Sequence, residues 1–257
     1  MRILLTGNKG FIGSRIENSL REIGADYIGI DYNEDIPSSR FDLILHFGAR
    51  TLIRNSKKQP YEYFRDNVDF TMKVLEKCRT EHSTIVYPTS GSVQSPTNPY
   101  SLTKRQGEEW VSLYSSLYGI TSYILKLYNI YGETSRKGAI FLFCSAAIKG
   151  EPVIMYGDGT HKRDFVHVDD LVSLIIEIIR QNLPSGTYEV GTGLATSIKD
   201  LLTLVEKIAG KKLIVEKQDY VMNEPEELYA KKTILKNPIP LEQGVRMVFN
   251  SLKDVEK

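Results

Sequence analysis

The first 23 residues place a short apolar strand directly before closely spaced glycines and an amphipathic helix. Residues 3–6 are strand-like, and apolar residues recur at helical spacing from Ile12 to Ile23. The turn between them reads Gly7-Asn8-Lys9-Gly10-Phe11-Ile12-Gly13. Glycines let such a turn close tightly and let backbone N–H groups approach an anion at the start of a helix. The unit therefore predicts a phosphate-binding turn, with a ligand-free glycine turn as the alternative.

The rest of the first half repeats this alternation of apolar strands and amphipathic helices. We expect strands at residues 27–30, 43–47, 84–87 and 123–127, and helices at residues 61–79 and 100–118. Strands that alternate with helices form a parallel sheet that carries helices on both faces. The first half therefore predicts an α/β fold with a doubly wound parallel sheet.

The pattern becomes less regular after Tyr128, and we expect a second, smaller lobe there. Helices are predicted at residues 140–148, 171–180 and 198–209, short strands at 152–156 and 188–190, and a mixed tail beyond. We place a first, dinucleotide-binding domain at residues 1–128, with residues 165–195 returning to it. Residues 129–257 then form mainly a substrate-binding lobe, whose segments interleave with the first domain.

Composition excludes several classes of function. The net charge of +1 gives no electrostatic reason for a nucleic-acid partner. Cys78 and Cys144 lie in apolar, helix-like segments and are interpreted as buried thiols. The four histidines lack the spacing of a metal site, so we expect no metal. Because neither a signal peptide nor an apolar run of about 18 residues is visible, we expect a cytoplasmic protein with no membrane partner.

An acidic residue, Asp31, ends the second predicted strand. A carboxylate there accepts hydrogen bonds from an adenosine ribose and repels a 2′-phosphate, which favours NAD over NADP. Lys9 points to the opposite preference, because a lysine in the turn can pair with a 2′-phosphate. We weigh Asp31 more heavily and expect NAD as the cofactor, with NADP left open.

A candidate catalytic pair, Tyr100 and Lys104, lies four positions apart on one predicted helix face. A free tyrosine has a pKa near 10 and is a poor base at neutral pH. A neighbouring ammonium and the positive ring of an oxidised nicotinamide lower that pKa. Ser90 ends a predicted parallel strand, at the sheet edge where ligands bind. The three residues together predict proton transfer to or from a substrate oxygen, whereas a lone tyrosine–lysine pair would indicate only a surface helix.

Taken in order, these motifs resemble the extended short-chain dehydrogenase/reductase family, in its nucleotide-sugar epimerase/dehydratase branch. The resemblance covers most of the chain and includes Asn129-Ile130-Tyr131-Gly132, Arg163-Asp164-Phe165-Val166-His167-Val168-Asp169-Asp170 and Tyr188-Glu189-Val190-Gly191. It implies a Rossmann-type fold with a smaller, interleaved C-terminal lobe and a nucleotide-diphosphate sugar as substrate. It also implies a homodimer packed through the helices near residues 61–79 and 100–118.

The family's site residues carry over onto matching positions of this chain. The catalytic set matches Ser90, Tyr100 and Lys104. With Lys9 added, the implied cofactor contacts are Gly7, Lys9, Gly10, Phe11, Ile12, Gly13, Asp31, Asp35, Ile36, Phe47, Gly48, Ala49, Asn67, Tyr100 and Lys104. The implied substrate contacts are Ser90, Gly91, Ser92, Asn129 and Arg163. For Arg163 the alternative is a structural ion pair with Asp169 or Asp170.

The chain departs from the family pattern in several places. Residues 31–42 are too few for the usual strand and helix, and Ser90 and Tyr100 are only 10 positions apart, which shortens the loop that covers the sugar. Residues 223–227 contain no arginine where the family often contacts the diphosphate. Gly91 and Ser92 stand where sugar 4,6-dehydratases carry an Asp-Glu pair, which argues against a dehydratase.

The leading hypothesis is a NAD-dependent nucleotide-sugar 4-epimerase, in which Tyr100 takes the C4 hydroxyl proton and the hydride leaves and returns through a 4-keto sugar. The main alternative is a NADH- or NADPH-dependent 4-keto-6-deoxysugar 4-reductase, with Tyr100 as proton donor. The shortened loop and Lys9 suit that alternative. A non-catalytic dinucleotide-binding sensor is a third interpretation, and the intact catalytic set argues against it.

Overall fold

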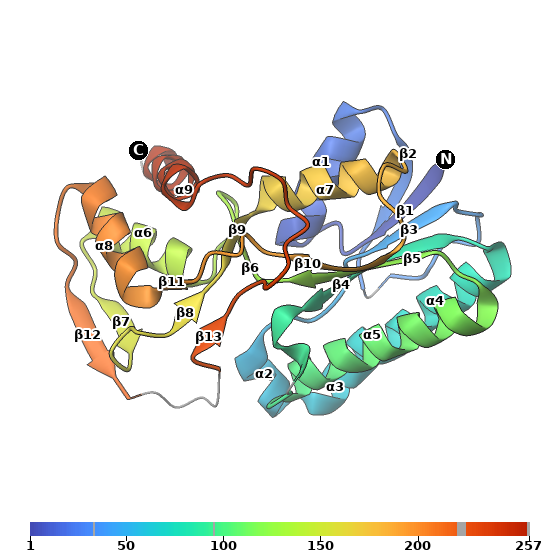
Figure 1. Cartoon of the computed structure of the whole chain (residues 1–257), viewed down its shortest axis with the longest axis horizontal. Coiled ribbons are helices and arrows are strands. Elements are labelled where there is room, and N and C mark those ends of the chain that lie inside the picture. The colour runs from blue at the N-terminus through green and yellow to red at the C-terminus, as the bar shows by residue number, and fades with distance from the viewer. Residues whose placement is uncertain (33, 95, 220–224, 256–257) are drawn as a thin grey trace. The chain divides into compact units, whose positions relative to one another are not determined.

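The computed structural model describes residues 1–32, 34–94, 96–219 and 225–255, and the chain divides into two compact units (Figure 1). Unit 1 contains Met1–Leu127 and Leu174–Tyr188, and unit 2 contains Tyr128–Ser173 and Glu189–Lys257. Each unit has a hydrophobic core of its own.

Unit 1 is built on a six-stranded sheet with the order β10-β5-β4-β3-β1-β2. The pairs β1/β2, β1/β3, β3/β4 and β4/β5 are all parallel, which confirms the predicted doubly wound sheet. The strands are β1 (Arg2–Thr6), β2 (Asp26–Ile30), β3 (Leu43–His46), β4 (Thr84–Ser90), β5 (Ser122–Leu127) and β10 (Gly186–Val190). The carboxyl ends of parallel strands share one edge, so the segments after β1, β2, β3 and β4 meet there.

Helices cover both faces of this sheet, with α1 on one side and α4 and α5 on the other (Figure 1). The helices of unit 1 are α1 (Phe11–Glu22), α2 (Ile53–Lys58), α3 (Pro60–Phe64), α4 (Phe70–Glu81), α5 (Pro99–Tyr118) and the second half of α7 (Val168–Ile179). The core between sheet and helices contains Leu4, Ile44 and Ile85 from the strands and Leu75 and Val111 from the helices. Burial of these apolar side chains fixes how the helices pack against the sheet.

The single helix predicted at residues 61–79 is wrong in one respect. It is divided into α3 and α4 by a π-helical turn, η1 (Arg65–Asp69). The wider turn brings three consecutive residues, Asp66, Asn67 and Val68, into the interior. Such turns occur mostly within α-helices and are frequent at functional sites, and apolar periodicity alone gives no sign of the extra residue.

Unit 2 contains three short sheets, β11-β8-β13, β12-β7 and β6-β9. Its elements are β6 (Asn129–Tyr131), α6 (Ala139–Lys149), β7 (Val153–Tyr156), β8 (Lys162–Arg163), β9 (Phe165–His167), the first half of α7, β11 (Thr196–Ser197), α8 (Ile198–Ala209), β12 (Val215–Gln218), β13 (Glu227–Leu228) and α9 (Leu241–Val255). Its core joins buried side chains of α6, α8 and α9, among them Phe143, Leu201 and Val248.

The mixed tail predicted after residue 209 contains two short strands, β12 and β13, and α9, a regular helix of 15 residues that was not predicted individually. Val245, Val248 and Leu252 face the core at helical spacing. Gly244 is required inside this helix, because a Cβ there would overlap the hydroxyl of Tyr131. A glycine in the helix and prolines just before it hide the periodicity from the sequence.

Both cysteines are buried, as predicted, and burial raises the pKa of each thiol to about 12. Thiols of this kind are packing groups and are not nucleophiles. Within the described residues, no helix is long and apolar enough to cross a membrane.

Candidate active site

The glycine turn connects β1 to α1 as the sequence predicts. Gly7 has a φ of +76°, which favours glycine, and its N–H donates to the carbonyl of Ile30 at 2.7 Å. A Cβ at Gly7 would lie 2.7 Å from the backbone of Gly48, and one at Gly13 would overlap the carbonyl oxygen of Gly7. α1 begins at Phe11 with no side-chain cap on its N-cap, Gly10. The turn is therefore a cradle of bare backbone at a helix N-terminus, the arrangement that holds a pyrophosphate.

The loop after β2 meets this turn through an ion pair between Lys9 and Glu34. We call Lys9, Asp31 and Glu34 the β2 edge. The second carboxylate oxygen of Glu34 accepts from the backbone N–H of Asp31 at 3.0 Å. The hydrogen bond between the two side chains raises the pKa of Lys9 and lowers the pKa of Glu34. As predicted, residues 31–42, apart from Asn33, form neither helix nor strand, and Asp35 is exposed while Ile36 is half-buried.

The segment after β3, Phe47-Gly48-Ala49, lies against the end of β1. Phe47 donates its N–H to the carbonyl of Thr6 at 3.2 Å, and Gly48 donates its N–H to the Thr6 hydroxyl at 2.9 Å. Gly48 is buried, whereas Phe47 and Ala49 are half-buried. Two segments that the sequence assigns to the cofactor, residues 7–13 and 47–49, therefore meet at one sheet edge.

A chain of hydrogen bonds runs through His46, which is buried. Its Nδ1 lies 2.8 Å from the Thr6 hydroxyl and its Nε2 lies 2.9 Å from the Thr71 hydroxyl. Burial lowers the pKa of His46 to about 3, with a smaller effect from the charge of Lys104, so the ring is neutral. The Thr71 hydroxyl donates to the carbonyl of Asn67 at 2.5 Å and must therefore accept from Nε2–H. Nδ1 then accepts from Thr6, and we call this path from Thr6 to Asn67 the His46 chain.

Asn67 extends the His46 chain to the helix that carries the catalytic pair. Its Oδ1 accepts from the N–H of Arg50 at 2.7 Å, and its Nδ2 donates to the carbonyl of Arg50 and to the Thr103 hydroxyl, both at 3.0 Å. Thr103 in turn donates to the carbonyl of Tyr100 at 2.8 Å. Both N–H groups of the Asn67 amide thus donate within the protein. Through its bond to Thr103, Asn67 helps to position α5.

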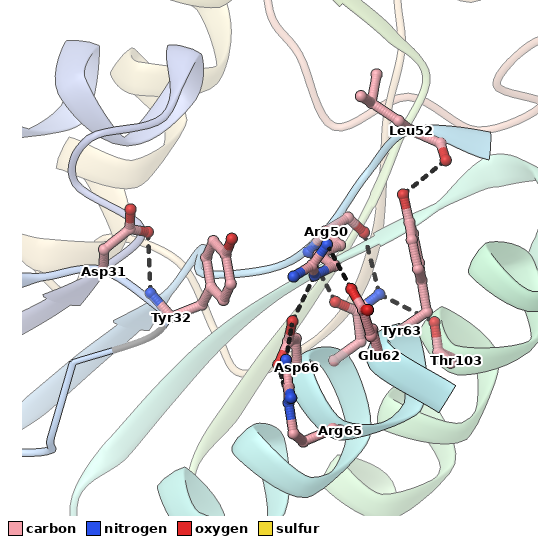
Figure 2. Close-up of polar contacts among 10 residues, drawn as sticks. Asp31, Tyr32, Arg50, Leu52, Glu62, Tyr63, Arg65, Asp66 and Thr103 are labelled. Carbon is pink, nitrogen blue, oxygen red and sulfur yellow. Dashed lines mark hydrogen bonds and ion pairs between the residues drawn. The ribbon is translucent and has the colours of Figure 1, made fainter. Parts of the chain in front are cut away.

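The side chain of Arg50 lies among acidic and aromatic groups of unit 1 (Figure 2). It pairs with Asp66, lies 3.1 Å from a carboxylate oxygen of Glu62, and its guanidinium carbon is 5.7 Å from the ring centre of Tyr32. Burial opposes the charge of Asp66, but hydrogen bonds from Arg65 and Arg50 hold its pKa below the ordinary value. Arg50 therefore ties the loop after β2 to the π-helical turn.

The candidate catalytic pair, Tyr100 and Lys104, lies near the start of α5. Asn98 caps this helix by accepting from the N–H of Ser101 at 2.9 Å, and Pro99 occupies its first position. Tyr100 and Lys104 follow one turn apart on the same face, as predicted. The cap therefore sets where the tyrosine enters the site.

Lys104 is buried, and its ammonium lies 4.2 Å from the ring centre of Tyr87 on β4. Burial lowers the pKa of Lys104 to about 7, and Glu108 acts in the opposite direction. A Cβ at Gly107 would overlap the hydroxyl of Tyr87, so this glycine lets α5 approach β4 closely. The ammonium of Lys104 therefore lies over an aromatic face, and the charge of Glu108, one turn further along the helix, partly offsets the effect of burial on its pKa.

The expected lowering of the Tyr100 pKa includes the positive ring of an oxidised nicotinamide, and the chain by itself shows the effect of burial. Burial raises the pKa of Tyr100 to about 12, with a smaller contribution from Tyr63. Desolvation penalises the phenolate, so burial favours the neutral phenol of Tyr100 in the chain without its cofactor.

Ser90 is the last residue of β4 and pairs with Leu127 of β5. Gly91 and Ser92 follow in a 3-10 turn, η2 (Gly91–Gln94). The side chain of Ser92 lies outside the described part of the structure. Ser90 therefore stands at the carboxyl edge of the sheet, on the strand that also supplies Tyr87.

The predicted substrate contacts Asn129 and Arg163 belong to unit 2, where Asp164 connects them. Asn129 donates its N–H and its Nδ2 to the carbonyl of Asp164, at 2.9 and 3.1 Å. Arg163 is buried and donates through Nη1 to the carbonyls of Lys162 and Pro225, at 2.9 and 3.1 Å. The stretch 223–227 begins with residues outside the described range, but its Pro225 thus contacts Arg163.

The sequence did not assign a role to Glu34, Arg50, Tyr87 or Glu108. Glu108 accepts from the ammonium of Lys126 at 3.0 Å and follows Lys104 by one turn of α5. Its spacing of four from Lys104 was the available signal for this position. Tyr87 and Glu34 each contact a lysine that is distant in sequence, and no local pattern predicts either contact.

Comparison with known proteins places the chain. Residues 3–191 match the NAD-dependent epimerase/dehydratase family. A relative, the UDP-glucuronate 4-epimerase of Thermodesulfobacterium geofontis, is 25% identical, and the match covers 98% of this chain and 96% of the relative. That alignment runs over 313 positions against the 257 residues of this chain, so the chain is shorter than the aligned region by more than 50 positions.

Solved structures share the fold. The UDP-glucose 4-epimerase of Thermotoga maritima, solved with UDP-glucose, has a TM-score of 0.89 at 20% identity and covers 100% of both chains. The UDP-glucuronic acid 4-epimerase of Bacillus cereus, solved with UDP-glucuronic acid and NAD, has a TM-score of 0.90 at 23% identity and covers 99% of this chain and 100% of its own. The family match spans well over half of the residues and includes the glycine turn and α5, so this chain belongs to the NAD-dependent epimerase/dehydratase family of enzymes.

Proposed function

We propose that this chain is a nucleotide-sugar 4-epimerase that uses NAD. The observation that carries the proposal is the arrangement of α5, where Tyr100 and Lys104 share a face and the lysine is buried over Tyr87. This arrangement belongs to the same unit as the glycine cradle. The printed names of the relatives, which are 4-epimerases of UDP-glucose and UDP-glucuronate, support C4 as the position that reacts.

The residues present fit the cofactor. The cradle at Gly7 and Gly13 has no room for a Cβ, which suits a backbone that closes around a pyrophosphate. Asp31 would accept from the adenosine ribose hydroxyls, and Phe47, Gly48 and Ala49 would line the cofactor at the sheet edge. When bound, NAD supplies the hydride acceptor and, in its oxidised form, a positive ring.

The protein's part in the reaction is proton transfer at the sugar oxygen. Tyr100 takes the proton from the C4 hydroxyl as C4 is oxidised and returns it when the 4-keto sugar is reduced from its other face. The ammonium of Lys104 favours the phenolate, and the hydroxyl of Ser90 hydrogen-bonds the reacting oxygen. The positive ring of the oxidised cofactor would oppose the rise that burial gives to the pKa of Tyr100.

For the substrate, we propose that Asn129 and Arg163 of unit 2 contact the diphosphate. A guanidinium with forked donors suits a phosphate group. The hydrogen bonds from Arg163 to the carbonyls of Lys162 and Pro225 occupy Nη1, and they orient the rest of the guanidinium. UDP-glucose is the first substrate to test, because the names of the relatives include it.

The decisive experiment incubates the purified chain with UDP-glucose and NAD, without an added reductant, and separates the sugar products. An epimerase converts part of the UDP-glucose to UDP-galactose until the two reach equilibrium, with no net consumption of NAD. The proposal would be contradicted if the chain converted none of UDP-glucose, UDP-glucuronate and their C4 epimers.

The alternative is a 4-keto-6-deoxysugar 4-reductase, and a short loop near the catalytic residues favours it. Ser90 and Tyr100 are only 10 positions apart, which shortens the loop expected to cover the sugar. A reductase would oxidise NADH or NADPH in proportion to a nucleotide-linked 4-keto sugar and would not interconvert C4 epimers. The same product analysis therefore separates the two activities.

We further propose a cytoplasmic homodimer that packs through the helices near residues 61–79 and 100–118, which are α3, α4 and α5. Exposed apolar side chains on these helices support it, namely Phe64, Leu102, Leu113 and Leu117. Light scattering of the chain should give twice the mass of 29.2 kDa, and Leu117→Glu should shift it toward the monomer. A monomeric wild-type chain at micromolar concentration would contradict the dimer.

A further inference from the structure

The sequence leaves two residues in opposition over the choice of cofactor, and the structure adds a third. Lys9 in the glycine turn suits a 2′-phosphate, and Asp31 at the end of β2 opposes one. Glu34 reaches both, because one carboxylate oxygen pairs with Lys9 and the other accepts from the N–H of Asp31 at 3.0 Å. Lys9 therefore already has an anionic partner from the protein.

Glu34 is held in place by the loop that carries it. Its N–H donates to the carbonyl of Asp31 at 3.1 Å, and its carboxylate returns to the N–H of the same residue. Because both the backbone and the carboxylate of Glu34 are hydrogen-bonded, the side chain needs little further ordering to stay on the ammonium of Lys9. Asp31 is fixed too, because its Oδ1 accepts from the N–H of Tyr32 at 2.9 Å.

The charges of the β2 edge follow from this arrangement. The hydrogen bond raises the pKa of Lys9 and lowers the pKa of Glu34, so both side chains are ionised at neutral pH. Two carboxylates then face one ammonium, and the edge as defined is negative. A ribose 2′-hydroxyl can donate to a carboxylate there, whereas a 2′-phosphate would have to displace Glu34 from Lys9 against the charge of Asp31.

We infer that Glu34 is a specificity-determining residue that makes the chain prefer NAD by occupying Lys9. Without the Glu34 carboxylate, Lys9 is a cation in the glycine turn that can pair with a 2′-phosphate. The inference rests on the proposed placement of the adenosine ribose at Asp31 and does not depend on which sugar reacts. It concerns binding, so it is tested without turnover.

The test is a fluorescence titration of the full chain with NADH and with NADPH. The quantity compared is the ratio of the Kd for NADPH to the Kd for NADH. In Glu34→Gln this ratio should fall about tenfold, because a charge-assisted hydrogen bond to phosphate replaces the lost ion pair. In the double variant Glu34→Gln/Lys9→Met the ratio should return to within about threefold of the wild-type value.

A matched control removes the same charge elsewhere in unit 1. Glu22 is exposed at the far end of α1, about 16 Å along the helix axis from its start. Glu22→Gln should leave the ratio within about twofold of wild type, because exposed charges at that distance are screened.

Three results would overturn the inference. The ratio could stay unchanged in Glu34→Gln, could fall equally with and without Lys9, or could fall as far in Glu22→Gln. If instead the wild-type chain binds neither NADH nor NADPH, the cofactor site of the proposed function fails before this inference is reached. The two failures are therefore distinguishable.

Discussion

Unit 1 holds its two lysines of interest in opposite ways. At the β2 edge, the side chain of Lys9 is 62% exposed and is held by one ion pair with Glu34. On α5, Lys104 is buried, and its ammonium lies over the ring of Tyr87. Water screens the first lysine, whereas the second loses solvation and has its pKa lowered by burial to about 7.

This difference separates what can change from what cannot. An exposed ion pair contributes little to stability, so the β2 edge can exchange residues without loss of the fold. Buried polar groups such as His46 and Lys104 depend on every neighbour that pairs with them. We therefore expect changes at the β2 edge to alter cofactor preference alone. Changes at His46 or Lys104 should alter turnover and stability.

The largest effect is expected for Tyr100→Phe. Loss of the proton-transferring hydroxyl should lower turnover of UDP-glucose by about 10²–10⁴-fold. NADH binding, followed by fluorescence, should remain, because the ring is retained. Tyr118→Phe at the other end of α5 is the matched control and should turn over normally. Turnover of Tyr100→Phe within twofold of wild type would show that another group carries the proton.

The next effect is expected for His46→Leu, which has a similar volume but no ring nitrogens. The Thr6 hydroxyl would lose its acceptor and the Thr71 hydroxyl would lose its donor, at a cost of about 2–4 kcal/mol in the free energy of unfolding. Urea denaturation measures this cost. His161→Leu, at a half-buried position in unit 2, should cost clearly less. Equal costs would mean that the His46 chain adds no stability.

A smaller effect is expected from the titration of Lys104. The unfolded chain keeps this proton up to about pH 10.5, whereas the folded chain loses it near pH 7. The unfolded state binds more protons between these values, so the free energy of unfolding should rise with pH, by about 1–2 kcal/mol from pH 7 to pH 9. Urea denaturation of the cofactor-free chain tests this. Lys104→Met should flatten the slope, and an unaltered slope would assign the rise to other groups.

The smallest effect is expected for the stability of Glu34→Gln. Its urea midpoint should match that of wild type within error, because Glu34 and Lys9 are exposed. The same variant is the one expected to change the NADPH-to-NADH ratio. A large loss of stability would contradict the contrast between the exposed β2 edge and the buried Lys104.

Local signals account for what the sequence predicts about the fold. The helix expected at residues 100–118 is α5, because Asn98, Pro99 and Gly119 mark its ends. The π-helical turn and α9 are missed for different reasons. An inserted residue does not disturb apolar periodicity enough to be seen, and Gly244 weakens the helical signal of α9.

The site divides along the same line. The glycine turn and the pair of Tyr100 and Lys104 are read from spacing within one element. The partner of Lys9 is 25 positions away in the chain, and the aromatic face under Lys104 comes from another element. In the chain without its cofactor, burial raises the pKa of Tyr100, and the extent of that burial is set by the whole unit. Contacts between elements carry no local pattern, so sequence alone does not reveal them.

The π-helical turn makes residues 65–69 sensitive to length. Each residue rotates an α-helix by about 100°, so deleting one residue here would restore the regular helix and turn part of the segment outward. Either Asp66 would leave Arg50, or Asn67 would leave Thr103. Point substitutions on the exposed face of this turn should be tolerated, whereas a single-residue deletion should separate the β2 loop from α5.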